Sequence, residues 1–150
     1  MELKGISAIV TGGSRGIGRA IALLLAAEGA DVTFFYLGNA AAADEVVAAG
    51  TAAGSRIAAL QVDIRDSRAC AEAVEGIAER CGGIDILVNN AGVIRDNPLA
   101  AFDDDDVRIV LDTNVTGVFN VTRAVVPYMI SQRKGRIINI GSVSGDKGGR

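Results

Sequence analysis

The sequence predicts an α/β fold, a doubly wound parallel sheet built in three layers with helices on both faces of the strands. Short apolar runs rich in β-branched residues recur along the chain, and helical segments of about ten to fifteen residues separate them. This alternation is typical of βαβ units, whose crossover helices cover the sheet. No repeat, low-complexity tract or proline-rich linker divides the chain, so we expect one domain over residues 1–150.

Each element follows from the local pattern of residues. The first strand is expected over residues 6–11, which end at a glycine cluster, and the first helix over residues 17–27, which are rich in Ala and Leu and end at Gly29. The later strands are expected over residues 31–36, 56–62, 84–88 and 136–140. The later helices are expected over residues 40–53, 67–80 and 103–132.

Four consecutive carboxylates, residues 103–106, begin the last of these helices. A metal site is one interpretation of such a run. A solvated helix start is the better one, because the helix dipole favours negative charge at that end.

Composition excludes several classes of function. Fifteen basic residues against eighteen acidic ones give a net charge of −3, which argues against nucleic-acid binding. The chain has no histidine, so Ser-His-Asp and Cys-His catalysis are excluded. Cys70 and Cys81 lack metal-binding spacing, and we expect reduced thiols. Because the longest apolar run, residues 20–27, is too short for a membrane span and no signal peptide is present, we expect a soluble cytoplasmic protein.

A glycine-rich loop lies between the first strand and the first helix, with glycines spaced G-x-x-x-G-x-G. Gly12 permits a sharp exit from the strand, Gly16 removes a side chain that would block a diphosphate, and Gly18 lets the helix approach the sheet closely. The helix N-terminus then offers free N–H groups to phosphates. An ordinary tight turn is the alternative, but the strand and helix around it favour a Rossmann-like dinucleotide site. The remaining loop residues in this predicted site are Gly13, Ser14, Arg15 and Ile17.

The end of the second strand indicates which dinucleotide binds. An NAD site places Asp or Glu there to hold the ribose 2′-hydroxyl, whereas this chain has Tyr36 and Leu37, followed by Gly38 and Asn39. Arg15, in the glycine loop, can reach a 2′-phosphate with a charge-assisted hydrogen bond. We therefore expect NADP(H), although Arg15 could also be a solvent-exposed loop charge.

The glycine loop and four later motifs together resemble the short-chain dehydrogenase/reductase family over the whole chain. The later motifs are Asp63 with Ile64 after the third strand, residues 89–92 after the fourth, Asn114 inside the last helix, and residues 140–142, ending at Ser142, after the fifth strand. Residues 92–99 (GVIRDNPL) and 134–145 look most like the 3-oxoacyl-[acyl-carrier-protein] reductases of fatty acid synthesis. This likeness implies NADPH-dependent reduction of a 3-oxoacyl thioester. A reductase of another alcohol or ketone and a non-catalytic dinucleotide-binding fragment remain the alternatives.

The strand ends carry the other candidate cofactor contacts. Asp63 and Ile64 lie at the carboxyl edge of the sheet, where the carboxylate can accept from an adenine amino group. The alternative for Asp63 is a position at the N-cap of the next helix. Asn90, Ala91 and Gly92 also follow a strand, where small residues let a ribose approach the backbone or form a tight turn.

The resemblance implies roles for three further positions. Asn114, inside the last helix, matches an Asn that holds a water in a proton relay, or is a buried hydrogen-bond partner. Ser142 matches a serine that hydrogen-bonds the substrate carbonyl, or is a turn residue. Arg133, with Lys134, could receive an acidic acyl carrier protein, although cations at a helix C-terminus are also explained by the dipole.

The family's general acid is a Tyr followed four residues later by a Lys, beyond the serine. The chain ends eight residues after Ser142, and the residues four beyond Tyr36 and Tyr128 are Ala40 and Gln132. We therefore expect the N-terminal part of a reductase, with the C-terminal strands missing and almost no activity of its own. A positioned general acid contributes about 10² to 10⁴ in rate. The full-length protein would form a homotetramer, as the family commonly does.

Overall fold

The computed structural model describes residues 1–143 and 145. Strands in this part of the chain are β1 (Ser7–Thr11), β2 (Asp31–Tyr36), β3 (Arg56–Gln61), β4 (Ile86–Asn89) and β5 (Arg136–Asn139). Its α-helices are α1 (Gly16–Ala27), α2 (Ala40–Ala52), α3 (Ser67–Cys81), α4 (Asp104–Leu111) and α5 (Gly117–Gln132). A 3₁₀ turn, η1 (Leu99–Ala101), precedes α4, and a π-helical turn, η2 (Asp112–Thr116), joins α4 to α5.

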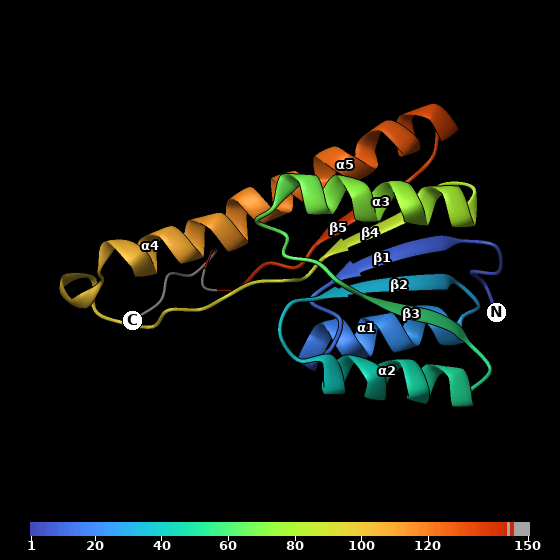
Figure 1. Cartoon of the computed structure of the whole chain (residues 1–150), viewed down its shortest axis with the longest axis horizontal. Helices are drawn as coiled ribbons and strands as arrows, with labels where there is room; N and C mark the ends of the chain where they lie inside the picture. The colour runs from blue at the N-terminus through green and yellow to red at the C-terminus, as the bar shows by residue number, and fades with distance from the viewer. Residues whose placement is uncertain (144, 146–150) are drawn as a thin grey trace.

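The strands form one parallel sheet in the order β3-β2-β1-β4-β5. Helices α1 and α2 cover one face, and α3 and α5 cover the other (Figure 1). The direction of winding reverses between β1 and β4, which opens a crevice at the carboxyl ends of the strands. The predicted three-layer, doubly wound fold is confirmed.

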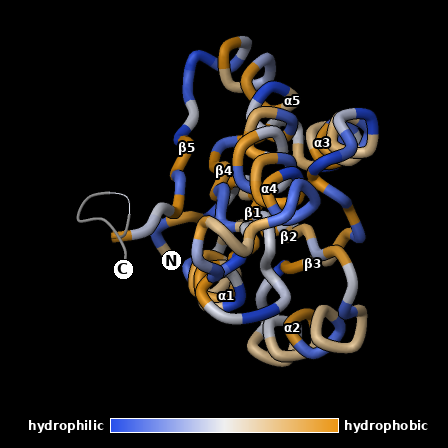
Figure 2. Tube along the Cα trace, turned by 90° about the vertical axis from the view of Figure 1, so that its left-hand side faces the viewer, coloured by the Kyte–Doolittle hydropathy of each residue, from blue (hydrophilic) through white to orange (hydrophobic). Residues whose placement is uncertain are grey.

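Alternate residues of the central strand build two separate cores. Ala8 and Val10 of β1 belong to the cluster that packs against α1 and α2, whereas Ile9 belongs to the cluster with α3 and α5. Successive side chains of a strand point to opposite faces, so a strand covered on both sides must be apolar throughout. All five residues of β1 are buried accordingly, and Figure 2 shows the helices above and below the sheet, with β5 at its side.

Strand β5 lies at the end of the described sheet and is exposed along its whole length. The side chains of Ile137 and Ile138 are 39% and 47% exposed. An apolar strand edge of this kind favours association with another strand.

The fourth strand begins later than the sequence predicts, at residue 86 in place of 84. The reason is a side chain of α5. Gln132 accepts a hydrogen bond from the Ile84 backbone N–H (2.9 Å) and donates one to the Ile84 carbonyl (3.0 Å). Since both backbone groups of Ile84 are taken by this amide, Ile84 is buried without belonging to the strand.

The long helix predicted over residues 103–132 is interrupted by the π-helical turn. Apolar periodicity does not register such a turn, because the helix continues on either side of it. Asp103 is the N-cap, accepting from the Asp106 N–H (2.8 Å), and residues 104–106 lie in the first turn, as the dipole argument predicts. Within the described residues, no cluster of acidic, cysteine or histidine side chains forms a candidate metal site.

Two further findings bear on the composition argument. None of the helices in residues 1–143 is both long and apolar enough to cross a membrane. Both cysteines are free thiols, and burial raises the pKa of the Cys70 thiol to about 11.

Asp85 joins the beginnings of three strands. Its Oδ2 accepts from the Ser7 N–H (3.0 Å), and its Oδ1 lies 2.8 Å from the Lys134 ammonium. Its backbone bonds to Ser7 and to Arg136. Burial alone would raise the pKa of Asp85, but Lys134 and the Ser7 N–H outweigh it and hold the pKa below its usual value.

We expect Asp85→Asn to lower the free energy of unfolding by about 1 kcal/mol at pH 7, since the ion pair is partly exposed. A carboxyl whose pKa is lowered by folding stabilises above its unfolded pKa of about 4, and this stabilisation is lost as the pH falls through the folded pKa. The difference in free energy of unfolding between the variant and the native chain should therefore become smaller below about pH 4. Urea denaturation of both proteins across this pH range measures that difference. Asp96→Asn, on an exposed loop, is the control and should change nothing; a gap that stays constant with pH would contradict the assignment.

Helix α1 begins directly behind the glycine loop and touches it at Gly18. A Cβ at this position would overlap the Gly12 carbonyl oxygen and the Asn90 side-chain nitrogen. The close approach at Gly18 is therefore made to the glycine loop and the Asn90 side chain, where the sequence predicted an approach to the sheet.

Gly18→Ala should destabilise the chain by about 1–3 kcal/mol, because an inserted methyl group must displace backbone atoms. The matched control is Gly76→Ala in α3, where an added Cβ meets nothing within 4 Å. That change should stabilise by about 0.5–1 kcal/mol through helix propensity. Thermal denaturation of both variants distinguishes the cases, and equal effects of the two changes would show that Gly18 is not tightly packed.

Candidate dinucleotide site

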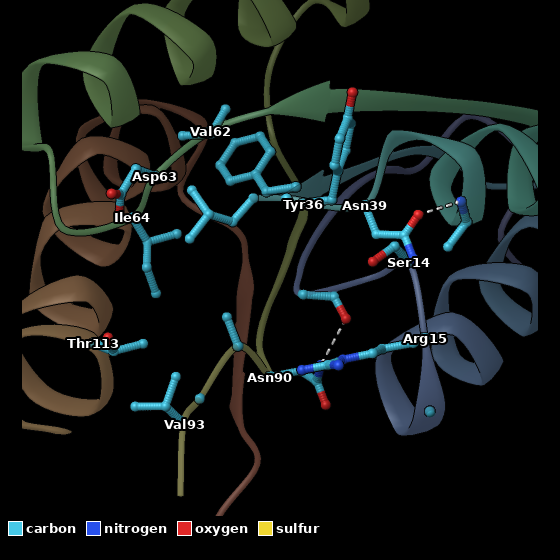
Figure 3. Close-up of a pocket in the computed structure, with 18 of the residues that line it drawn as sticks. Ser14, Arg15, Tyr36, Asn39, Val62, Asp63, Ile64, Asn90, Val93 and Thr113 are labelled. Carbon is cyan, nitrogen blue, oxygen red and sulfur yellow. Dashed lines mark hydrogen bonds between the residues drawn. The ribbon is translucent and has the colours of Figure 1, made fainter. Parts of the chain in front are cut away.

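A cavity of about 650 Å³ opens at the carboxyl edge of the sheet. Its volume is in the usual range for small-molecule sites. Figure 3 shows Ser14, Arg15 and Asn39 on one side of it and Asp63, Ile64 and Thr113 on the other. Most of the predicted site residues line it, namely Gly12, Ser14, Arg15, Gly16, Ile17, Tyr36, Leu37, Asp63, Ile64, Asn90, Ala91 and Gly92. Gly13, Gly18, Asn114 and Ser142 are not part of its lining.

The N-terminus of α1 opens into this cavity without a side-chain cap. Its N-cap residue, Arg15, makes no capping hydrogen bond, and the first turn carries no acidic residue. By contrast, Asn39, Asp66 and Asp103 cap α2, α3 and α4. The first N–H groups of a helix need an acceptor, so those of α1 are available for an anion in the cavity.

The glycines of the loop shape this end of the cavity. Gly12 and Gly16 have φ angles of +68° and +54°, which favour glycine. A Cβ at Gly16 would meet nothing within 4 Å, so the space in front of the helix is open, as a diphosphate site requires. Gly13 lies behind the cavity, where its N–H donates to the Phe35 carbonyl (3.1 Å) and a Cβ would overlap the Phe34 side chain.

The end of β2 carries no acidic side chain into the cavity. Leu37 is 53% exposed there, and the Asn39 side chain is occupied by the Ala42 N–H (3.0 Å). Arg15 is exposed on the same side of the cavity as Asn39 (Figure 3) and has no ion-pair or hydrogen-bond partner for its guanidinium within the described residues. This combination leaves an unpaired positive charge next to the end of β2.

The loop after β3 places Asp63 in the cavity wall, with its carboxylate turned onto Arg65. The Asp63 carboxylate accepts from the Arg65 backbone N–H and from its guanidinium, at distances from 2.6 to 3.1 Å. These bonds hold the pKa of Asp63 below its usual value. The cap of the next helix is Asp66, which accepts from the Arg68 and Ala69 N–H groups, so Asp63 is not an N-cap.

Asn90 joins the ends of β1 and β4. Its Nδ2 donates to the carbonyls of Thr11 (3.0 Å) and Gly12 (3.1 Å). The Thr11 hydroxyl in turn accepts from the backbone N–H groups of Asn90 and Ala91, each at 3.0 Å. The side chain of Asn90 therefore builds the floor of the cavity, and Ala91 and Gly92 expose backbone to it.

Asn114 lies in the π-helical turn and clamps the segment after β4. Its Oδ1 accepts from the Val93 N–H (2.8 Å), and its Nδ2 donates to the Val93 carbonyl (2.9 Å). Val93 lines the cavity. Asn114 is exposed, in contrast to the buried partner that the sequence suggests as an alternative.

Ser142 and Arg133 lie at opposite edges of the sheet. Ser142 follows β5 at the carboxyl edge, is exposed, and accepts through its carbonyl from the Gly145 N–H (3.0 Å). Arg133 ends α5 with φ of +53° and precedes the start of β5, so it lies at the amino edge of the sheet. Its neighbour Lys134 is committed to the ion pair with Asp85, so the basic spot is smaller than the sequence suggests.

Sequence reasoning missed four polar side chains that bond the strand ends and loops. One is Thr11, and the other three are on α5, namely Asn120, Thr122 and Gln132. Asn120 bonds to the loop after β3, and Thr122 accepts from Asn89 of β4 (3.0 Å). An amide in mid-helix is locally unfavourable. That signal singled out Asn114, and it applies equally to Asn120.

Comparisons with known proteins agree with this geometry. The family model described as short chain dehydrogenase matches residues 7–150. The 3-oxoacyl-[acyl-carrier-protein] reductase FabG of Vibrio harveyi is 43% identical over 99% of this chain and 59% of its own length. The 3-oxoacyl-[acyl-carrier-protein] reductase of Synechocystis sp. is 44% identical over 94% of this chain and 57% of its own length.

Solved structures give the same result. A short chain dehydrogenase from Burkholderia cenocepacia, in complex with NADP, superposes with a TM-score of 0.92 at 42% identity, covering 100% of this chain and 60% of the other. A double mutant of a Serratia marcescens short-chain dehydrogenase/reductase superposes with a TM-score of 0.89 at 39% identity. The match covers 97% of this chain and 58% of the mutant's chain. The chain thus spans about three fifths of the length of these relatives. With its fold, its glycine loop and these likenesses taken together, the chain belongs to the short-chain dehydrogenase family.

Proposed function

We propose that this chain binds NADP(H) in the cavity and forms part of a reductase that converts a 3-oxoacyl thioester to the 3-hydroxy compound. The observation that carries the cofactor proposal is the uncapped N-terminus of α1, which faces open space at Gly16 with the exposed guanidinium of Arg15 beside it. The NADP in the Burkholderia cenocepacia structure and the name of the Vibrio harveyi relative support it.

The cavity fits the parts of such a cofactor in order. The diphosphate would lie against the N–H groups of α1. The 2′-phosphate would lie between Arg15 and the end of β2, where no carboxylate repels it. The adenine would then meet the loop that carries Asp63 and Ile64, and the other half of the cofactor would extend towards Asn90 and Val93.

The chemistry of this proposal needs a hydride donor, an aligned carbonyl and a proton donor. A bound reduced nicotinamide supplies the hydride. The Ser142 hydroxyl would donate a hydrogen bond to the carbonyl oxygen of the substrate, while Asn114 fixes Val93 in the cavity wall through two hydrogen bonds. Without histidine in these 150 residues, Ser142 has no imidazole to activate it as a nucleophile.

The substrate and the partner are proposed from the relatives alone. Arg133 ends α5 at the amino edge of the sheet, whereas Ser142 follows β5 at the carboxyl edge. An acyl carrier protein as partner, a homotetramer and a cytoplasmic location therefore remain predictions that rest on the resemblance.

Arg15→Ala should weaken NADP⁺ binding about tenfold or more and leave NAD⁺ binding almost unchanged, because a hydrogen bond between charged groups contributes about 1.5–3 kcal/mol. Titration calorimetry with both nucleotides measures the change. Arg19→Ala, an exposed arginine of α1 outside the cavity lining, is the matched control. If NADP⁺ binds the Arg15 variant as well as the native chain, Arg15 has no part in the site.

The 150-residue chain should bind NADPH without turning over a 3-oxoacyl thioester at ordinary enzyme rates. Its two tyrosines, Tyr36 and Tyr128, lack a lysine four residues later, and loss of a positioned general acid costs about 10² to 10⁴ in rate. Fluorescence of bound NADPH and its absorbance during incubation with substrate measure binding and turnover separately. Fast oxidation of NADPH would show that another residue supplies the proton.

A further inference from the structure

Asn120 is a buried amide that holds the cavity wall from behind. Its side chain is on α5 and only 7% of the residue is exposed. The single Nδ2 donates to two successive carbonyls of the loop after β3, Ile64 (3.0 Å) and Arg65 (3.1 Å). Its Oδ1 lies 3.5 Å from the Arg123 guanidinium. The loop after β3 is therefore fixed to α5, a helix that follows it 56 residues later in the sequence.

A second contact fixes the same loop to the same helix face. Gly117 is three residues before Asn120, so the two are neighbours on the surface of α5. A Cβ at Gly117 would lie 2.6 Å from Ile64 Cδ1 and 2.7 Å from Ile64 Cγ1. The absence of a side chain at Gly117 thus lets the Ile64 side chain pack directly on the helix backbone.

The loop fixed in this way forms one wall of the cavity. Residues 62–65 all line it, and Figure 3 shows Asp63 and Ile64 on the side opposite Arg15. The polar groups that this wall can offer are the Asp63 carboxylate, the Arg65 guanidinium that bonds it, and the backbone of the loop. Asp63 is already bonded to Arg65, so its direction also depends on where the Arg65 backbone is held.

We propose that Asn120 is a positioning residue for the dinucleotide, setting the place of the Asp63–Arg65 loop and so the selection of adenine over other purines. This inference rests on the proposed NADP(H) site. Asn120 acts only through the loop, because it is not part of the cavity lining. Hydrogen-bond recognition requires groups placed to within a few tenths of an ångström, so a loop that can shift loses selectivity as well as affinity.

The test compares NADP⁺ with nicotinamide hypoxanthine dinucleotide phosphate, in which a carbonyl oxygen replaces the adenine amino group and the adjacent ring nitrogen N1 carries a proton. The native chain should bind NADP⁺ about tenfold more tightly than the analogue, the size of one discriminating hydrogen bond. Asn120→Leu keeps the bulk and removes the donor. It should weaken NADP⁺ binding severalfold and bring the ratio of the two affinities close to one.

Gln132→Leu is the matched control. Gln132 is also on α5 and also bonds two groups of a loop backbone, at Ile84, but it is at the amino edge and outside the cavity. Its loss should lower stability by a similar amount and leave the affinity ratio unchanged. A second variant, Gly117→Ala, pushes on Ile64 without removing a hydrogen bond, and should lower the ratio too, which keeps the test valid if Asn120→Leu does not fold.

The outcomes separate the inference from the proposed function. If the native chain binds neither nucleotide, the proposed NADP(H) site fails. If it binds both equally, or if folded Asn120→Leu keeps the native ratio, the cofactor site stands and the role of Asn120 is wrong. A ratio that falls equally in Gln132→Leu would show a general loss of stability and would also overturn the inference. Circular dichroism and urea denaturation establish the folding of each variant.

Discussion

The packing of Gly18 against the Gly12 carbonyl and the Asn90 amide is the contact on which the cavity depends. Because nothing separates the helix from the loop at this point, the first turn of α1 starts at the carboxyl edge of the sheet with its N–H groups directed outward. Asn90 bonds the same carbonyl and that of Thr11, so the loop is held from the strand side as well. A larger residue at Gly18 would move the helix and the anion site together.

Polar side chains of the helical segment from α4 to α5 hold other loops, which the contact of Gly18 with Gly12 and Asn90 does not involve. Asn114 clamps the segment after β4, Asn120 clamps the loop after β3, and Gln132 clamps the segment before β4. Each satisfies backbone groups that have no strand partner, which a buried or half-buried loop requires. Gln132 lies at the amino edge, outside the cavity, so it is Asn114 and Asn120 on this layer and Gly18 on the other that hold the shape of the cavity, although most of its lining comes from strand ends.

The sequence predicts the order of elements and the doubly wound class correctly, because apolar period and glycine position are local signals. Two of its element boundaries are wrong. The start of β4 is displaced by Gln132, and the long helix contains a π-helical turn where Asn114 bonds Val93. The structure also gives the N-cap of α3 to Asp66, while the adenine contact of Asp63 stays a prediction. At Ile84 and at the start of α3, the outcome depends on which side chain bonds the nearby backbone groups, and apolar periodicity does not record such bonds.

The sequence by itself determined the family resemblance, the glycine loop and the absence of an acidic residue at the end of β2, since these are properties of contiguous residues. Only the tertiary structure decided which side chains hold the site. Asn120 meets Ile64 across 56 residues of sequence and Asn114 meets Val93 across 21. The physical reason is that a side-chain amide can form a hydrogen bond with any unpaired backbone N–H or carbonyl near it. Only the folded chain determines which backbone group is near.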